Sequence, residues 1–321
     1  AIKSGAVKAS DLPNMVDHIT IDYQRSTMFK NNLILLDMLA HFDWKRTMNF
    51  SNGGIYDSEN VFYLDDYLQF DGFTYRLVPI KTPVRKDGEI GRVDAESLYE
   101  TVKNFRWGNF KNTDVHFDET STSNIISYRN SAGRAAEALA LSGQKQKALE
   151  ILDLVSKEIP VSKYNDARSL ASIAYAYIVA GEEKKGLALA DQLKKEIFVE
   201  FDYYSALPSE QQRFVSRQMR TKTMEYSLVV AAVTDAYEKS GQKDKAYNYL
   251  VKSLEPVDKR FNDFVKNLEQ MGKEKAFRET DKVQRITPFY SYLFDIMTPY
   301  DSTFAKEKED QITKAIMRVA Q

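Results

Sequence analysis

The sequence predicts a mainly α-helical protein in which a solenoid of helical hairpins follows a small α+β portion. Three observations support this fold class. A glycine-centred pattern of apolar side chains recurs along the chain, nearly every stretch after Ser123 has helical periodicity, and two short stretches before residue 92 alternate as strands do. We therefore expect an α+β portion over residues 1–92, with two short strands, and a helical array over residues 93–321.

The first hairpin is predicted over residues 123–160, with its turn at Gly143. Small or apolar side chains share one helical face before the glycine and another after it: Ala135, Ala136, Leu139, Ala148, Leu152 and Val155. Small side chains let two helices approach closely, a glycine can adopt the left-handed conformation that ends a helix, and Pro160 stops the second helix. The two faces are therefore expected to pack against each other.

The same pattern recurs around Gly181 and Gly241. The equivalent positions are Ile173, Ala174, Tyr177, Gly186, Ala190 and Leu193 in one copy, and Val233, Thr234, Tyr237, Ala246, Leu250 and Ser253 in the other. These offsets resemble the tetratricopeptide hairpin, which implies a solenoid with a surface for binding protein segments. Successive glycines are 38 and 60 residues apart, whereas a regular array repeats at about 34 residues. We therefore expect an insertion between the second and third hairpins.

The remaining elements follow from periodicity and from residues that start or break helices. In the N-terminal portion we expect a helix at 31–42, a strand at 44–50, a helix at 61–70, a strand at 73–80, and a helix capped by Asp94 that ends near 105. After the second hairpin we expect a helix at 209–240 with a capping box of Ser209 and Gln212, and a helix at 245–277 that Pro256 kinks or breaks. Further helices are expected from Pro288 to Met297 and from about Thr303 onward.

Composition and charge argue against several classes of function. Lys and Arg total 45 against 46 Asp and Glu, so a net charge of −1 offers no broad basic field for nucleic acid and no polybasic membrane anchor. The absence of cysteine excludes disulfides, thiolate nucleophiles and cysteine-based metal sites. The chain begins without Met and contains no apolar run of about 18 residues, so we expect either a processed product or an excised segment of a longer protein.

No catalytic, metal-binding or cofactor motif is evident. His18, His41 and His116 are far apart, and none has a second metal ligand three or four residues away. Both glycine-rich phosphate-loop patterns are missing. Asp65 and Asp66 are neighbours on a predicted helix and diverge by about 100°, so they cannot act together on one glycosidic bond. We therefore expect no catalytic residue, no metal and no cofactor in this segment.

Aromatic and arginine side chains of the N-terminal portion are the first candidates for a binding role. Trp44 and Arg46 lie on one face of the predicted strand. The favoured interpretation is structural, with the tryptophan packed and the arginine paired to Asp37 or Asp43, and the alternative is contact with a ligand or partner.

Two Tyr-Arg pairs present the same choice. Tyr75 and Arg76 lie on the second predicted strand, and Tyr128 and Arg129 lie near the start of the first hairpin. A polar clamp between strand and helix is favoured, and contact with a sugar or a peptide is the alternative.

An aromatic cluster and a basic stripe complete the candidates. The cluster comprises Phe198, Phe201, Tyr203 and Tyr204, in the expected insertion. It either forms an exposed patch for a partner or, as we favour, packs against the next helix at Met224, Tyr226 and Leu228. The stripe of Arg217, Arg220 and Lys222 is expected to be a solvated helix face.

Several stretches resemble a bacterial family of multi-pass membrane proteins that are protein O-mannosyltransferase-like. The family's Trp-Lys-Arg-Pro-Ile-Tyr-Phe phrase falls on residues 44–50, its Gly-x-x-Tyr-Arg-Leu-Val-Pro phrase on 72–79, its Tyr-Arg-Ser-Asn-like helix start on 128–130, and its Tyr-Tyr insert on 203–204. Thr47, Met48 and Asn49 differ from the family's Pro-Ile-Tyr. The resemblance covers most of the chain and implies a C-terminal region that follows the last membrane span and faces the periplasm. The family's membrane-embedded core and its acidic catalytic residues are absent from this sequence.

Two hypotheses of function follow. The favoured one is a non-catalytic accessory or scaffold domain at the periplasmic face of the inner membrane, which binds a protein or peptide, or its own membrane-embedded domain, through a helical-repeat surface. The alternative is a carbohydrate-binding or glycan-processing domain that uses aromatic and arginine side chains of the N-terminal portion.

Overall fold

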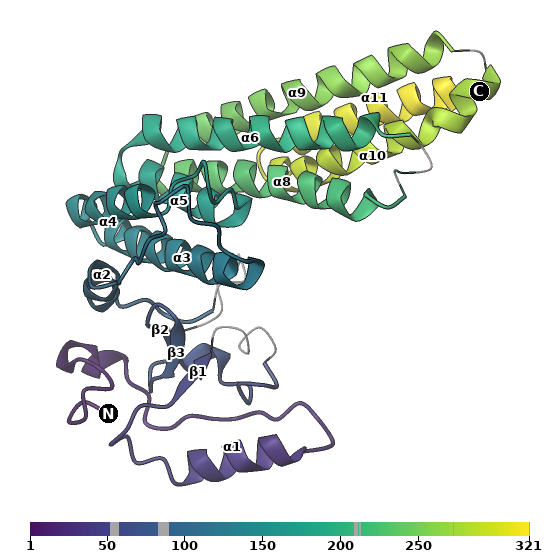
Figure 1. The fold of residues 1–321 in the computed structure, drawn as a ribbon. Coiled ribbons are helices and arrows are strands. Elements are labelled where there is room, and N and C mark those ends of the chain that lie inside the picture. The colour runs from purple at the N-terminus through teal and green to yellow at the C-terminus, as the bar shows by residue number, and fades with distance from the viewer. Residues whose placement is uncertain (52–57, 83–89, 209–210, 212, 272, 321) are drawn as a thin grey trace. The chain divides into compact units, whose positions relative to one another are not determined.

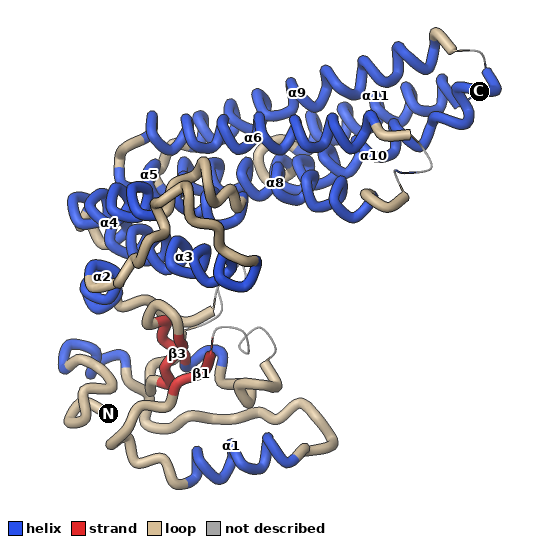
Figure 2. Tube along the Cα trace, in the orientation of Figure 1, coloured by secondary structure: helices blue, strands red, loops and turns tan. Residues whose placement is uncertain are grey.

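The computed structural model describes residues 1–51, 58–82, 90–208, 211, 213–271 and 273–320, with the backbone alone described for 273–284 and 319–320. The chain forms two compact units, residues 1–159 and 160–321. The protein is mainly helical, with a small sheet near the N-terminus (Figures 1 and 2). The strands in the described residues end at Leu77, and from Ala95 onward the regular elements described are helices. The first compact unit nevertheless extends to Ile159 and includes the first hairpin.

The sheet of the first unit contains, within the described residues, the strands β1 (Asn49–Ser51), β2 (Leu68–Phe70) and β3 (Thr74–Leu77). Their order is β1-β3-β2, and both pairings are antiparallel. The strand predicted at 73–80 is confirmed by β3, whereas the strand predicted at 44–50 is reduced to its end, because the backbone bends at Trp44, whose φ is 63°.

The helix predicted at 61–70 is wrong. Residues Asp65–Tyr67 form one 3-10 turn and Leu68–Phe70 form β2. The backbone of β2 pairs with β3, and all three of its side chains are buried. Burial on both faces removes the alternation by which a strand is usually recognised, so the apolar run looks helical in the sequence.

Helix α1 (Lys30–Ala40) confirms the helix expected at 31–42. Its Leu35 and Leu39 pack on a cluster of buried side chains: Met48, Phe62, Leu64, Tyr67 and Leu77. Helix α2 (Ala95–Lys103) begins at the expected cap, where a carboxylate oxygen of Asp94 accepts the N–H of Ser97 at 3.0 Å. Helices α3 (Glu119–Leu141) and α4 (Lys145–Glu158) form the first hairpin and pack together and on α2.

The second unit is entirely helical in its described elements: α5 (Ala167–Ala180), α6 (Glu183–Ala206), α8 (Ser216–Lys239), α9 (Lys243–Glu269), α10 (Lys273–Met297) and α11 (Ser302–Ala320). Helix α5 packs on both α6 and α8 and is buried on almost every side, which suits its nearly uniform apolar sequence. The predicted capping box of Ser209 and Gln212 lies outside the described residues.

The three glycines lie at the turns of three helical hairpins, as predicted. Gly143, Gly181 and Gly241 have φ values of 82°, 103° and 72°, the left-handed region that favours glycine. After each one, the next residue donates its N–H at 2.8 Å to the carbonyl five residues earlier, which closes the helix end in the same way. Every position of the repeated pattern, from Ala135 to Ser253, is buried.

The two prolines do not break or open a helix. Pro256 lies inside the continuous helix α9, and Pro288 lies inside α10 instead of opening a helix. Each proline removes one backbone hydrogen bond. Both helices continue because packing outweighs that loss: Leu254 and Val257 are buried beside the first proline, and Phe289 is buried beside the second.

Candidate binding site

Arg134 of α3 joins the first hairpin to the sheet. Its guanidinium donates to the Tyr75 hydroxyl at 3.0 Å and to the carbonyls of Ile90 and Gly91 at 2.9 and 3.1 Å. It also lies over the Phe70 ring, with 4.1 Å between the guanidinium carbon and the ring centre. The side chain is almost fully buried. A strand-to-helix clamp therefore exists, with Tyr75 as one member and Arg134 as the residue that sequence reasoning missed.

The other members of the predicted clamp lie elsewhere in the first unit. Arg129 is 1% exposed and donates to the carbonyl of Ile159 at 3.1 Å, so it holds the end of the hairpin from inside. Arg76 pairs with Asp71, with 2.8 Å between Nε and Oδ2. Arg129 is buried and Arg76 is partly buried in an ion pair, and we assign both a packing role in this structure.

Tyr128 stands at the centre of an aromatic cluster. The rings of Phe73, Phe105, Trp107 and Phe110 lie 4.5–5.8 Å from its ring, centre to centre. All of these side chains are half-buried, so the cluster is part of the surface. They come from the β2–β3 turn, the end of α2 and the following loop, segments that the sequence does not connect by any motif.

Trp44 lines a cavity of about 380 Å³ in the first unit. Its ring packs on Phe42 at 4.6 Å, and both lie against the core cluster. Most of the lining is apolar and includes Ile19, Ile21 and Leu39, with Asp17 and His18 also on the wall. We call this cavity the Trp44 pocket.

Arg46 is exposed, and the two carboxylates expected as its partners, those of Asp37 and Asp43, contact other residues. Asp43 pairs with Lys45 at 2.9 Å and Asp37 with His41 at 3.4 Å. The reason is the bend at Trp44, which replaces the strand geometry on which the predicted pairing depended.

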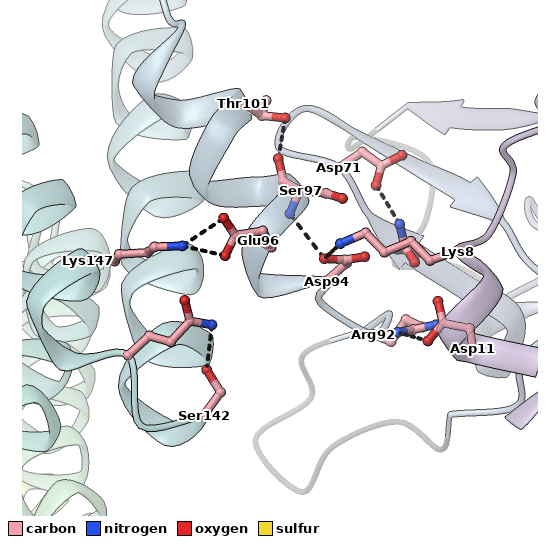
Figure 3. Close-up of polar contacts among 12 residues, drawn as sticks. Lys8, Asp11, Asp71, Arg92, Asp94, Glu96, Ser97, Thr101, Ser142 and Lys147 are labelled. Atoms are coloured by element: carbon pink, nitrogen blue, oxygen red, sulfur yellow. Dashed lines mark hydrogen bonds and ion pairs between the residues drawn. The ribbon is translucent and has the colours of Figure 1, made fainter. Parts of the chain in front are cut away.

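Ion pairs join the N-terminal segment to the residues at the start of α2, and a further ion pair joins α2 to α4 (Figure 3). We call these contacts the polar network. Lys8 pairs with Asp94 at 2.7 Å, Arg92 with Asp11 at 3.1 Å, and Lys147 with Glu96 at 2.7 Å. Burial raises the pKa of Asp94, but hydrogen bonds from the Lys8 ammonium and the Ser97 N–H outweigh it and hold that pKa below its ordinary value. The network is a structural one, because its carboxylates are held by cations within the same unit.

The aromatic cluster of the second unit divides between core and surface. Phe198 and Phe201 are buried and pack on Phe289, and Phe198 also packs on Tyr226. Tyr203, by contrast, is 64% exposed, and Tyr204 is half-buried with its ring 5.6 Å from that of Tyr203. The basic stripe also divides: Arg217 and Arg220 are exposed, whereas Lys222 pairs with Glu200 and Glu225 at 3.0 and 2.9 Å.

The second unit contains a groove of about 1010 Å³. Helix α10 contacts both α8 and α11 and forms the floor, and the other two helices form the walls. The lining residues of α10 and of the turn that follows it run from Arg285 to Thr298, a length of about 20 Å. We call this feature the α10 groove.

The lining of the α10 groove is mixed. Apolar contacts come from Met219, Pro288, Phe294, Ile312 and Ile316. Hydroxyls come from Thr287, Ser291, Thr298, Ser302 and Thr313. Charges come from Arg220, Arg285, Lys306, Asp295 and Glu309. Sequence reasoning missed the groove because its residues lie on three helices that are joined only by tertiary packing, although Arg220 belonged to the basic stripe.

The ionisable groups of the described residues do not gather into a metal site. No group of three or more His, Asp or Glu side chains with suitable geometry occurs among them. In the same part of the chain, no helix is both long and apolar enough to cross a bilayer.

Comparison with known proteins gives one match. Residues 1–97 match the family model described as TMEM260-associated domain 2. The matched range contains α1, the sheet and the Trp44 pocket, and it is less than a third of the 321-residue chain. The searches of curated proteins and of solved structures give no match.

Proposed function

We propose that this chain is a non-catalytic binding module whose second unit takes a segment of another protein into the α10 groove. The observation that carries the proposal is the shape and lining of the groove. A floor of about 20 Å accommodates about six residues of extended chain. The lining combines apolar contacts with hydroxyls and charges of both signs, which suits a peptide, because a peptide presents apolar side chains and backbone hydrogen-bonding groups together.

We further propose that the hairpins are tetratricopeptide-like. The repeated burial pattern and the three identical glycine turns support this. Repeat arrays of this kind bind protein segments on their surfaces. In this proposal the partner is a separate protein or the membrane-embedded part of a longer parent protein.

We place the module at the periplasmic face of the inner membrane, as an accessory of a membrane glycosyltransferase-like protein. Support comes from the sequence resemblance to protein O-mannosyltransferase-like proteins and from the match of residues 1–97 to TMEM260-associated domain 2. The domain boundary at residues 92/93 belongs to the same proposal, since the family match ends close to it.

Selection of peptides from a random display library against the 321-residue chain tests the groove. Ser291 is an exposed lining residue of α10, and Ser291→Trp fills the groove without disturbing a buried contact. Lys252 is exposed on α9 and outside the groove, so Lys252→Trp is the matched control. We expect selected peptides to bind the control like the wild type and the groove variant about tenfold more weakly or worse. Failure to select any binder, or equal binding to both variants, contradicts the proposal.

A second candidate function is glycan binding by the aromatic cluster around Tyr128. Half-buried rings offer flat apolar surface beside solvent, and Trp107 contributes to it together with Phe73 and Phe110. A glycan array probed with the wild type, Trp107→Ala and the control Phe214→Ala tests this. Phe214 is an exposed aromatic of the second unit. We expect signals that Trp107→Ala abolishes and Phe214→Ala retains, and an array without signal removes this candidate.

A further inference from the structure

Helix α1 of the first unit presents an unusually apolar surface. Leu35 and Leu39 turn toward the core, but the large apolar side chains of the other faces are exposed: Phe29, Leu33, Ile34, Leu36 and Met38. Phe29, Leu33 and Leu36 are spaced by four and three residues, so they form one stripe along the helix. Exposed apolar residues scattered singly are ordinary, whereas a continuous patch of this kind marks an interaction surface.

The charges around this patch are cationic on balance. Residues 28–46 contain three Lys or Arg and two Asp, a formal net charge of +1, although the whole chain carries −1. Asp43 is paired with Lys45, and Asp37 lies 3.4 Å from His41, a contact that is an ion pair only when the histidine is protonated. Lys30 begins the helix and the exposed Arg46 follows its end, so positive charge flanks the apolar patch on both sides.

The Trp44 pocket lies beside the C-terminal end of α1, on the side of the helix that faces the core. Leu39 of the helix and Phe42 just after it both line the pocket. Its volume of about 380 Å³ lies within the range of pockets that hold small apolar ligands. The left-handed backbone at Trp44 places the indole on the pocket wall, and a non-glycine residue in that conformation is a strained feature typical of functional sites.

The dimensions of α1 argue against a second copy of the chain as the occupant. A helix of eleven residues is about 16 Å long and about 10 Å wide. A stable protein–protein interface buries about 800 Å² on each partner and involves about 20 residues a side, more than this eleven-residue helix contains. A lipid surface needs no shape complementarity, and its anionic headgroups complement flanking cations.

We propose that α1 and the Trp44 pocket form a membrane-contact element that lies flat in the headgroup region of an anionic bilayer. The stripe of Phe29, Leu33 and Leu36 enters the boundary with the acyl chains, the pocket receives an apolar chain end, and Lys30 and Arg46 contact phosphates. With eleven residues, α1 lies on the bilayer and does not span it, because a span needs about 20 residues. This inference uses residues of the first unit and stands independently of the α10 groove.

Co-sedimentation of the 321-residue chain with vesicles of phosphatidylcholine and phosphatidylglycerol tests the proposal. Leu33 is 53% exposed, so Leu33→Asp leaves the core intact, and Val199→Asp on α6, at a position 62% exposed, is the matched control. We expect the wild type and the control to sediment with the vesicles and Leu33→Asp to bind about tenfold more weakly. We expect Arg46→Glu also to weaken binding to these vesicles, and unchanged binding would contradict the contact of this cation with phosphates.

Indole fluorescence gives a second readout. In Trp107→Phe, the remaining tryptophan is Trp44, and we expect its emission to shift to shorter wavelength when vesicles are added. Absence of sedimentation by the wild type, or unchanged sedimentation by Leu33→Asp, overturns the proposal. A dimer that Leu33→Asp disperses, without vesicle binding, also overturns it and assigns the surface to a second copy of the chain.

Discussion

Arg134 shows how one side chain can settle the arrangement of distant segments. Its planar guanidinium reaches a tyrosine hydroxyl of β3 and two carbonyls of the segment before α2 at once, and it covers an aromatic ring of β2. Lysine, a compact point charge, cannot satisfy three acceptors in this fork geometry. No sequence signal singles out this arginine, because its partners lie 43, 44 and 59 residues away.

Gly186 carries the first prediction at this scale. A methyl group at this position would lie 2.6 Å from the carbonyl oxygen of Ala174, a backbone atom of α5 that cannot move aside cheaply. Alanine favours helix formation over glycine by about 1 kcal/mol, yet overpacking a close contact costs about 1–3 kcal/mol. We therefore expect Gly186→Ala to lower the free energy of unfolding of the second unit.

Chemical denaturation followed by circular dichroism measures this effect. Lys184→Ala, at an exposed position of the same helix, is the control and should leave the denaturation midpoint nearly unchanged. A midpoint for Gly186→Ala at or above that of the wild type would show that α5 and α6 do not approach as closely as described.

At the scale of elements, features that depend on neighbouring residues were predicted correctly, and features that depend on pairing with distant residues were not. Helix α2 begins at its predicted cap, and the hairpins turn at their predicted glycines, because both signals act within a few residues. Strand β2 and the bend at Trp44 were missed, because each depends on contacts with residues distant in the sequence.

The N-cap of α2 carries a pH-dependent prediction. The pKa of Asp94 is lowered in the folded state below its ordinary value of 3.8. The ionised carboxylate therefore contributes stability that is complete well above this value and is lost as the pH falls through it. Asp94→Asn keeps an acceptor for the Ser97 N–H but loses the charge that faces Lys8.

We expect Asp94→Asn to melt at a lower temperature than the wild type at pH 7, with the difference narrowing toward pH 3. Thermal melts at both pH values measure it. Glu100→Gln, an exposed substitution in the same helix, should match the wild type at both. A difference for Asp94→Asn that is independent of pH would show that the carboxylate charge contributes nothing.

At the scale of the whole molecule, the change in secondary structure and the boundary between the two compact units fall at different residues. Strands give way to helices between Leu77 and Ala95, whereas the first compact unit ends at Ile159 and the second begins at Pro160. The reason is that α3 is bonded to the strand region through Arg134 and through the Ser131 hydroxyl, which donates to the carbonyl of Gly72. The first hairpin therefore belongs to the first unit although its sequence pattern belongs to the repeats.

Two fragments test this division. Residues 160–321 have their own core and should fold alone, with a helical circular dichroism spectrum and one cooperative thermal transition. Residues 93–321 leave the Arg134 guanidinium without Tyr75, Ile90 and Gly91, so we expect this fragment to show an additional transition at lower temperature. Equal stability of the first hairpin in 93–321 and in the full chain would contradict the division.

The sequence by itself determined the mainly helical class, the small sheet near the N-terminus, the hairpin turns and the buried repeat positions, because periodicity, caps and glycine turns are encoded within short stretches. Only the tertiary structure decided which arginine forms the clamp, that α10 floors a groove between α8 and α11, and that α1 keeps its apolar faces uncovered. These features arise where segments far apart in the chain meet. A local sequence pattern does not specify whether a distant segment covers a given side chain or leaves it exposed.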